Sequence, residues 1–302
     1  MHRCDCDLRS SVSPTTPKRR AQLWTVTLLV AFCIWAANAS WAQAASCVST
    51  ISSCGCTINS PGLYDVNANL DASQGLTGSG DCIDIAARAT LDLKHFSVHG
   101  NGTGVGIHLM TSSRNSTLIQ PNAGTISHWG IGVKVDANNV DLQFIDVESS
   151  TAAGIVLNGV TNSHLSLVSS DKNGGAGVQI SGGGGNNVSE GGFDRNAQGI
   201  LLDSSNRNRI DECFVGRSDI PNGTGILLSG SSDNNHLIDN DVGGNTKFGI
   251  FIASGSTKNV VGETFVSGGP NGVFDAEDDN SGCDTNTWFD NKFGTVNQGC
   301  IK

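Results

Sequence analysis

The sequence predicts an all-β protein whose chain winds into about nine stacked coils, a parallel β-helix. Two observations predict this fold. A short motif, glycine followed by an apolar, a variable and an apolar residue, returns every 22 to 26 residues. Between its copies the apolar residues come in short bursts rich in Val and Ile, with no 3.6-residue period long enough for a helix. A repeat of this length is typical of a solenoid.

The motif begins at regularly spaced glycines. They are Gly106, Gly132, Gly154, Gly177, Gly199, Gly225, Gly249 and Gly272, and Cys82 to Ile85 fit the same register. Side chains of a strand alternate between its faces, so the two apolar residues of each motif should point inward and the variable residue outward. Successive coils would pair about 4.8 Å apart and bury one face of every strand. Gly and Asn are expected at the corners, where φ is positive.

The repeat resembles that of the right-handed parallel β-helix family, the pectate-lyase-like superfamily. The residues that carry the resemblance are the Gly-Ile-x-Leu starts and an asparagine at the next corner, at Asn162, Asn187, Asn208, Asn235 and Asn259. The ending CDTNTWFDNKFGTVNQGCI is also similar to the terminal segment of secreted members. The resemblance covers residues 54–302 and implies the right-handed fold. It implies no single function, because the family contains lyases, hydrolases, epimerases, adhesins and proteins without known activity.

The first 45 residues have the composition of a secretory signal peptide. Five basic residues precede an apolar segment at residues 23–39, and Ala42-Gln43-Ala44 supplies a cleavage site. A membrane anchor is the alternative, although the apolar segment is short for a span. We therefore expect a secreted protein, periplasmic, extracellular or on the cell surface, with no membrane span after the leader is removed.

The rest of the chain is expected to form an N-terminal cap at residues 46–80, coils at 81–274 and a C-terminal cap at 275–302. Export permits disulfides. We expect Cys283 to pair with Cys300, and the sequence leaves open how Cys47, Cys54, Cys56 and Cys82 pair. Cys213 is isolated and is expected to be a buried thiol. A zinc site at Cys54 and Cys56 is the alternative at the first end, although a Cys-x-Cys pair lacks the usual ligand spacing.

The charge balance excludes one class of partner. The leader contains five of the 18 basic residues and two of the 28 acidic residues. The rest of the chain therefore has 13 basic and 26 acidic residues and is strongly acidic. Such a surface repels phosphate backbones, so nucleic acid is not an expected partner.

A charged patch is expected on the first coils. Reading the variable motif position from coil to coil gives the outward column Asp84, His108, Lys134, Val156, Gln179, Leu201, Leu227, Phe251 and Phe274. Its first three members are ionisable and would lie about 5 Å apart. Asp136 would flank Lys134, and a loop with His128 and Trp129 would overhang the patch. These groups suit the binding of an acidic sugar and the transfer of a proton, with Trp129 stacking on a sugar ring. The alternative is a set of ordinary cross-strand ion pairs.

A second acidic group follows the last predicted coil. Asp275, Glu277, Asp278 and Asp279 are weak candidates for Ca²⁺ ligands, because their spacing matches no EF-hand. A solvated acidic loop is the alternative, and we expect no other cofactor.

Two classes of function remain. The favoured one is a non-catalytic extracellular or surface module that binds a polysaccharide or another partner. The alternative is a polysaccharide-active enzyme, a lyase or epimerase acting on acidic glycans. The module is favoured because the carboxylate pairs and the calcium–arginine sets of the family's known enzymes do not fall in register here. Whether the protein is an enzyme stays open.

Overall fold

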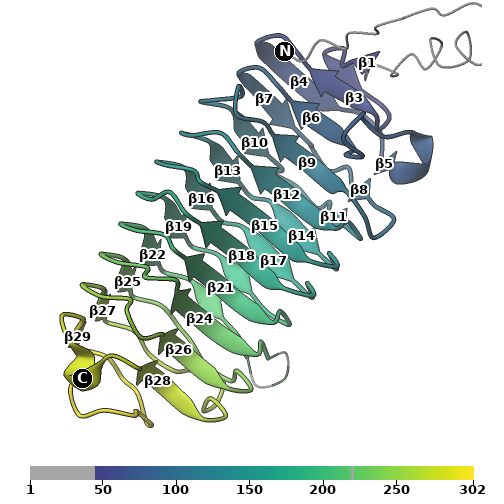
Figure 1. Cartoon of the computed structure of the whole chain (residues 1–302). Coiled ribbons are helices and arrows are strands. Elements are labelled where there is room, and N and C mark those ends of the chain that lie inside the picture. Colours follow the sequence, from purple (N-terminus) through teal and green to yellow (C-terminus); the bar gives the residue numbers. More distant parts are fainter. Residues whose placement is uncertain (1–44, 218, 220) are drawn as a thin grey trace, which may run out of the picture. The chain divides into compact units, whose positions relative to one another are not determined.

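The structure, a computed structural model, describes residues 45–217, 219 and 221–302, which form a parallel β-helix (Figure 1). Each full coil contributes one strand to sheet A, one to sheet B and, along most of its length, one to sheet C. The predicted signal peptide, apart from Ala45, lies outside the described residues. Within them, no helix is long and apolar enough to cross a membrane.

Sheets A and B run the whole length of the described coil stack. Sheet A consists of β1 (Ala45–Ser46), β3 (Cys56–Ile58), β6 (Ile83–Ile85), β9 (Val105–Leu109), β12 (Ile131–Val135), β15 (Ala153–Asn158), β18 (Ala176–Ser181), β21 (Gln198–Asp203), β24 (Thr224–Ser229), β26 (Phe248–Ile252) and β28 (Phe274–Asp278). Sheet B consists of β2 (Thr50–Ile51), β4 (Gly62–Val66), β7 (Ala89–Asp92), β10 (Thr117–Ile119), β13 (Asp141–Gln143), β16 (His164–Ser166), β19 (Asn187–Ser189), β22 (Arg209–Asp211), β25 (His236–Ile238), β27 (Val260–Gly262) and β29 (Thr287–Phe289).

Sheet C is shorter, and two single-turn helices complete the described elements. Sheet C consists of β5 (Leu70–Asp71), β8 (Val98–His99), β11 (Ile126–Ser127), β14 (Asp146–Glu148), β17 (Ser169–Asp171), β20 (Gly192–Phe193) and β23 (Phe214–Val215). The 3₁₀ helices are η1 (Ala72–Gln74) and η2 (Ser281–Cys283). Because sheets A and B each hold 11 strands, the coils extend beyond both ends of residues 81–274, and both expected caps contain strands of the sheets.

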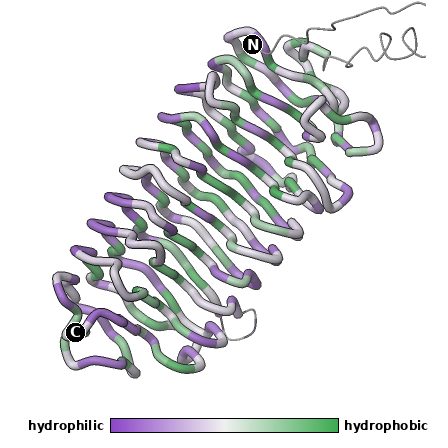
Figure 2. The backbone as a smooth tube through the Cα atoms, in the orientation of Figure 1, coloured by the Kyte–Doolittle hydropathy of each residue, from purple (hydrophilic) through white to green (hydrophobic). Residues whose placement is uncertain are grey.

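The core is a stack of the apolar motif residues. In β9, Ile107 and Leu109 are fully buried while His108 between them is partly exposed. The same alternation recurs at Val133 and Val135 in β12, and Figure 2 shows apolar segments returning from coil to coil. Each such side chain contributes about 1.5–3 kcal/mol by leaving water. The predicted direction of the motif residues is therefore confirmed.

The motif positions need glycine because neighbouring atoms leave no room for a Cβ. A Cβ at Gly154 would lie 1.9 Å from Ser170 Oγ, and one at Gly132 would lie 2.2 Å from Val147 Cγ1. Positive φ between the strands is supplied by glycines such as Gly159 and Gly230, as expected, and also by varied other residues. After the strands of sheet B it occurs at Phe144, Leu167, Glu190, Glu212, Asp239 and Glu263, and elsewhere at Asn115, Asn139, Asn162 and Asn234. The expectation that Gly and Asn supply the corners is only partly met.

Two buried asparagine ladders run along the corners of the coils. One contains Asn173, Asn196, Asn222, Asn245 and Asn271, and the other contains Asn186, Asn208, Asn235, Asn259 and Asn286. In most rungs an Oδ1 accepts a backbone N–H of the preceding coil, as Asn208 does from Asn186 at 3.1 Å. Buried amides need such partners. Asn162 and Asn187, which were expected in this column, lie outside it, and their neighbours Ser163 and Asn186 occupy the ladder.

Disulfides close both ends, as predicted. Cys283 pairs with Cys300, and at the first end Cys47 pairs with Cys56 and Cys54 with Cys82. The alternative of a zinc site at Cys54 and Cys56 is therefore wrong, because both sulfurs are bonded to other cysteines. Cys213 is a buried free thiol, and burial raises its pKa to about 12.

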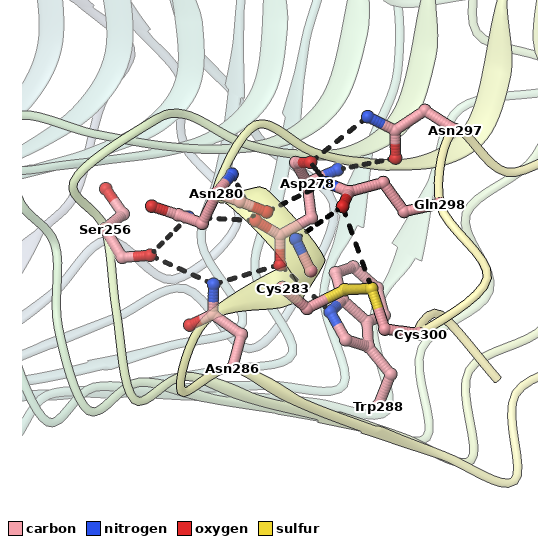
Figure 3. The surroundings of a disulfide bond; sticks show 10 residues. Ser256, Asp278, Asn280, Cys283, Asn286, Trp288, Asn297, Gln298 and Cys300 are labelled. Carbon is pink, nitrogen blue, oxygen red and sulfur yellow. Dashed lines mark hydrogen bonds between the residues drawn. A yellow bond between two sulfur atoms is a disulfide. The ribbon is translucent and has the colours of Figure 1, made fainter.

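The C-terminal tail covers the last strand of sheet A. Val296 forms a bridge with Ala276 of β28, and the Cys283–Cys300 disulfide ties the tail to η2 (Figure 3). Trp288 is 5 % exposed and stacks edge-on against Phe293. Its indole donates a hydrogen bond to Asp278 (Figure 3). The tail therefore protects an edge that would otherwise pair with another chain.

Candidate functional site

The outward column on sheet A follows the predicted register over most of its length. Asp84 of β6 pairs with His108 of β9, which pairs with Lys134 of β12. The column continues in register through Val156, Gln179, Leu201 and Leu227 to Phe251. Its last member was predicted wrongly, because Phe274 pairs with Phe248 and Glu277 lies beside Phe251. The last coil is shifted by three residues relative to the expected register.

His108 forms the centre of the charged cluster. Its Nδ1 lies 3.1 Å from Asp81 Oδ2 and its Nε2 lies 2.7 Å from Asp136 Oδ2. Lys134 Nζ lies 2.8 Å from the same oxygen of Asp136, and Asn158 donates to Asp136 Oδ1 at 3.0 Å. The cross-strand ion pairs expected as the alternative are therefore present, with both imidazole nitrogens in contact with carboxylates.

Sequence reasoning missed Asp81, the third carboxylate of the cluster. It precedes Cys82 just before β6, outside the alternating part of the strand, and it is 3 % exposed. Its Oδ1 accepts the backbone N–H of Val105 at 2.9 Å, which turns Oδ2 toward His108. The Cys54–Cys82 disulfide holds the adjacent residue in place. The signal in the sequence that could have revealed this carboxylate is the position of Asp81, directly before Cys82 and three residues before Asp84.

The surroundings of the cluster shift its proton affinities in different directions. Burial opposes ionisation of Asp81, but hydrogen bonds, chiefly with His108 and Ser79, outweigh it and lower the pKa of that carboxyl. Burial raises the pKa of Asp84. The hydrogen bond with Asp81 raises the pKa of His108, so the contacts favour the protonated imidazole. At Asp136, burial is outweighed by hydrogen bonds with Lys134, His108 and Asn158, which lower its pKa.

His128 and Trp129 do not overhang the cluster. Trp129 is fully buried and its Nε1 donates to Val98 O at 3.0 Å, so the expectation that it stacks on a sugar ring is wrong. A Cβ at Gly100 would lie 2.5 Å from the indole, so this glycine makes room for the ring. His128 is exposed at the corner after β11, with its ring 4.7 Å from that of His99 on sheet C.

The second acidic group belongs to a strand, so the expected acidic loop is wrong. The carboxylate of Asp275 accepts the amide of Asn271 and the backbone N–H groups of Gly294 and Thr295. Asp278 is fully buried and accepts protein N–H groups at both oxygens. These two carboxylates are occupied by internal hydrogen bonds. Glu277 lies beside Phe251 in the outward column, and burial raises its pKa.

A groove that sequence reasoning missed follows the corner between sheets B and C. Its volume is about 400 Å³, and Phe214 and Phe265, which are 54 % and 36 % exposed, line it. The remaining lining residues are Leu167, Glu190, Glu212, Cys213, Asp239 and Asp241. Corner residues do not follow the alternation of the strands, which is why the motif did not reveal their direction.

Comparisons with known proteins find the same architecture. Residues 125–293 match the family described as a right-handed β-helix region. Among solved structures, a point mutant of the periplasmic alginate epimerase AlgG is similar with a TM-score of 0.55 and 16 % identity, over 80 % of this chain and 70 % of that one. The Dettilon tailspike protein gp208 is similar with a TM-score of 0.51 and 9 % identity, over 77 % and 54 % of the two chains. No curated protein sequence matches. At such identities the solved structures show the fold alone.

Proposed function

Because the chain belongs to the right-handed β-helix family, we propose that it is an exported protein that binds a polysaccharide along the outward face of sheet A. A continuous row of polar side chains on this face carries the proposal. Beyond the charged cluster, Asn158, Ser181, Asp203 and Ser229 lie in register on four successive strands. Their spacing of about 4.8 Å offers a regular series of donors and acceptors to a polymer whose hydroxyl groups also repeat.

Two further observations support this class of function. The three disulfides are typical of an oxidising compartment, where polysaccharides of cell surfaces are accessible. The protein of similar fold named an alginate epimerase acts on a polysaccharide. We therefore assign the ligand as a polysaccharide and the role of the charged cluster as an anchoring point for it.

The test is binding of the purified protein, expressed from the full-length chain, to a panel of immobilised neutral and acidic polysaccharides. Lys134→Ala and Asn158→Ala should each weaken binding, by about 10- to 150-fold for the charged contact, because a hydrogen bond to a charged group contributes about 1.5–3 kcal/mol. Lys172→Ala is the matched control, since this ammonium pairs with Glu148 on sheet C, 2.7 Å away.

A substitution in the groove tests whether the glycan binds there or on the outward face of sheet A. Phe214→Ala removes an exposed ring at the groove, away from the outward column of sheet A, and should leave binding unchanged. Loss of binding in Phe214→Ala, with full binding retained in Lys134→Ala, would place the glycan in the groove and overturn the assignment to sheet A. Absence of binding to every glycan of the panel would overturn the proposed function as a whole.

A lyase or epimerase acting on acidic glycans is the second candidate. The observation in its favour is the imidazole of His108, next to Asp136 and the ammonium of Lys134, because such groups can pair with a uronate and move its proton. Both imidazole nitrogens contact carboxylates, which favour the protonated ring, so one contact must open and the ring must lose a proton before it can accept one from a substrate. This cost favours binding over catalysis. Unsaturated or epimerised products that form with the wild type and vanish in His108→Ala would replace the first proposal with this one.

A further inference from the structure

One buried oxygen of the charged cluster has no hydrogen-bond partner among the described residues. It is Oδ1 of Asp84, a residue that is 5 % exposed. This oxygen faces His108 Nδ1 at 3.9 Å, beyond hydrogen-bond distance. A buried carboxylate oxygen without a donor is costly, so it points to a missing positive group. One carboxylate oxygen of Asp81, one of Asp84 and one ring nitrogen of His108 lie within 4.8 Å of one another.

We propose that Asp81, Asp84 and His108 bind a divalent transition-metal ion, with Zn²⁺ as the ion that their donor set fits best. The inference does not depend on the polysaccharide proposal, because it concerns only how these three side chains are arranged. In a tetrahedral site with metal bonds of about 2.1 Å, two ligand atoms lie about 3.4 Å apart, so the ligand atoms of the three side chains would approach one another by up to about 1.4 Å when the ion binds.

Each proposed ligand is held by its other polar atom. Asp81 uses Oδ1 to accept the N–H of Val105, at 2.9 Å. Asp84 uses Oδ2 to accept the hydroxyl of Ser79, at 3.0 Å, and Ser79 in turn contacts Thr77. These contacts leave the second oxygen of each aspartate directed toward the imidazole.

His108 has the partner that metal-bound histidines commonly have. Its Nε2 lies 2.7 Å from Asp136 Oδ2, and Asp136 is oriented by Lys134 and Asn158. A carboxylate that accepts the distal N–H of a histidine leaves the other nitrogen with its lone pair free for a metal and raises its basicity. Binding would thus replace the proton at Nδ1 with the ion and release that proton.

The donor set selects the class of ion. An imidazole nitrogen with two carboxylate oxygens suits Zn²⁺ and related first-row ions. Ca²⁺ takes six to eight oxygen ligands, and this cluster supplies a nitrogen and two carboxylates. The His108 side chain is 13 % exposed, so solvent or a ligand has access to a fourth coordination position. The site would therefore keep an open position on the outward face of sheet A.

The test is titration of the chelator-treated protein, expressed from the full-length chain, with ZnCl₂ at pH 7 by isothermal titration calorimetry. One Zn²⁺ should bind per chain with proton release, measured by repeating the titration in buffers of different ionisation enthalpy. Asp84→Asn, which keeps the side-chain size, should remove saturable binding. Asp136→Asn should weaken binding by about 10–100-fold, as loss of a partner to a ligand histidine does.

His164→Ala is the control, because His164 is an exposed histidine on sheet B with a carboxylate 3.9 Å away. It should bind Zn²⁺ as the wild type does. No saturable binding in the wild type, undiminished binding in Asp84→Asn with its fold intact by circular dichroism, or equal affinity for Ca²⁺ would overturn the proposal. None of these results depends on a glycan, so failure here is distinct from failure of the proposed function.

Discussion

Asp278 ends a buried asparagine ladder by accepting a hydrogen bond from Asn286, with Nδ2 3.0 Å from its Oδ2 (Figure 3). Each amide of this ladder donates to the next asparagine, and among the described residues the amide of Asn286 donates to Asp278 and to Ser256 O. A carboxylate, which only accepts, completes the series. The other ladder ends in the same way, with Asn271 Nδ2 2.9 Å from Asp275 Oδ1. Asp275 and Asp278, two of the three aspartates that the sequence offers as calcium candidates, thus have a structural role.

Asp278→Asn should destabilise the protein although it hardly changes the side-chain size. Oδ1 accepts two bonds from Asn280, and Oδ2 accepts from Asn286 and Trp288. An amide NH₂ in place of either oxygen would face donors and leave buried groups unpaired, which costs about 1–3 kcal/mol. Urea unfolding should show this loss, while Asp279→Asn, at an exposed neighbour, should show none. Equal midpoints for the two variants would contradict the account.

Asp275 should make part of the stability depend on acid pH. Burial opposes its ionisation, but N–H groups of Asn271, Gly294 and Thr295 outweigh burial and lower its pKa below the ordinary 3.8. The folded state then binds fewer protons than the unfolded one. The contribution is therefore present above pH 3.8 and lost as the pH falls through the lower, folded pKa.

Urea unfolding between pH 2 and pH 7 measures this effect. The difference in unfolding free energy between the wild type and Asp275→Asn should be largest near neutral pH and shrink in the acid range. Asp284→Asn, at an exposed carboxylate of the same segment, should run parallel to the wild type throughout. A difference between the wild type and Asp275→Asn that stays constant over the whole range would show that ionisation of Asp275 plays no part.

The repeat predicted the fold and the first members of the site because strand alternation is strict. Asp84, His108 and Lys134 occupy one motif position, so their contact followed from the spacing of the coils. Asp81 and Trp129 lie just before strands, where the direction of a side chain depends on the corner. At Trp129 the preceding His128 has a φ of +59°, which turns the indole into the core. No alternation rule predicts such a turn.

The corner asparagines are a second case in which the repeat did not predict the direction of a side chain, and substitutions can test it. Asn186 accepts from Ser163 N–H and donates to Val160 O and Asn208 Oδ1, whereas the adjacent Asn187 makes none of these contacts. Asn186→Ala should lower the unfolding free energy by about 2–4 kcal/mol, because it leaves several buried groups unpaired. Asn187→Ala should cost much less. The reverse order in thermal or urea unfolding would mean that Asn187 belongs to the ladder, as the repeat alone suggested.

The C-terminal disulfide should control both stability and self-association. It closes a segment of 17 residues, for which chain entropy predicts a contribution of about 3 kcal/mol. It also retains the tail whose Val296 bridges Ala276 and so covers the edge of β28. The double variant Cys283→Ser and Cys300→Ser should therefore unfold at a lower urea concentration and free this edge to pair with other chains.

Sedimentation velocity over a concentration series should reveal association of this variant beyond that of the wild type. A variant that is destabilised but sediments like the wild type would show that the tail covers the edge without the disulfide.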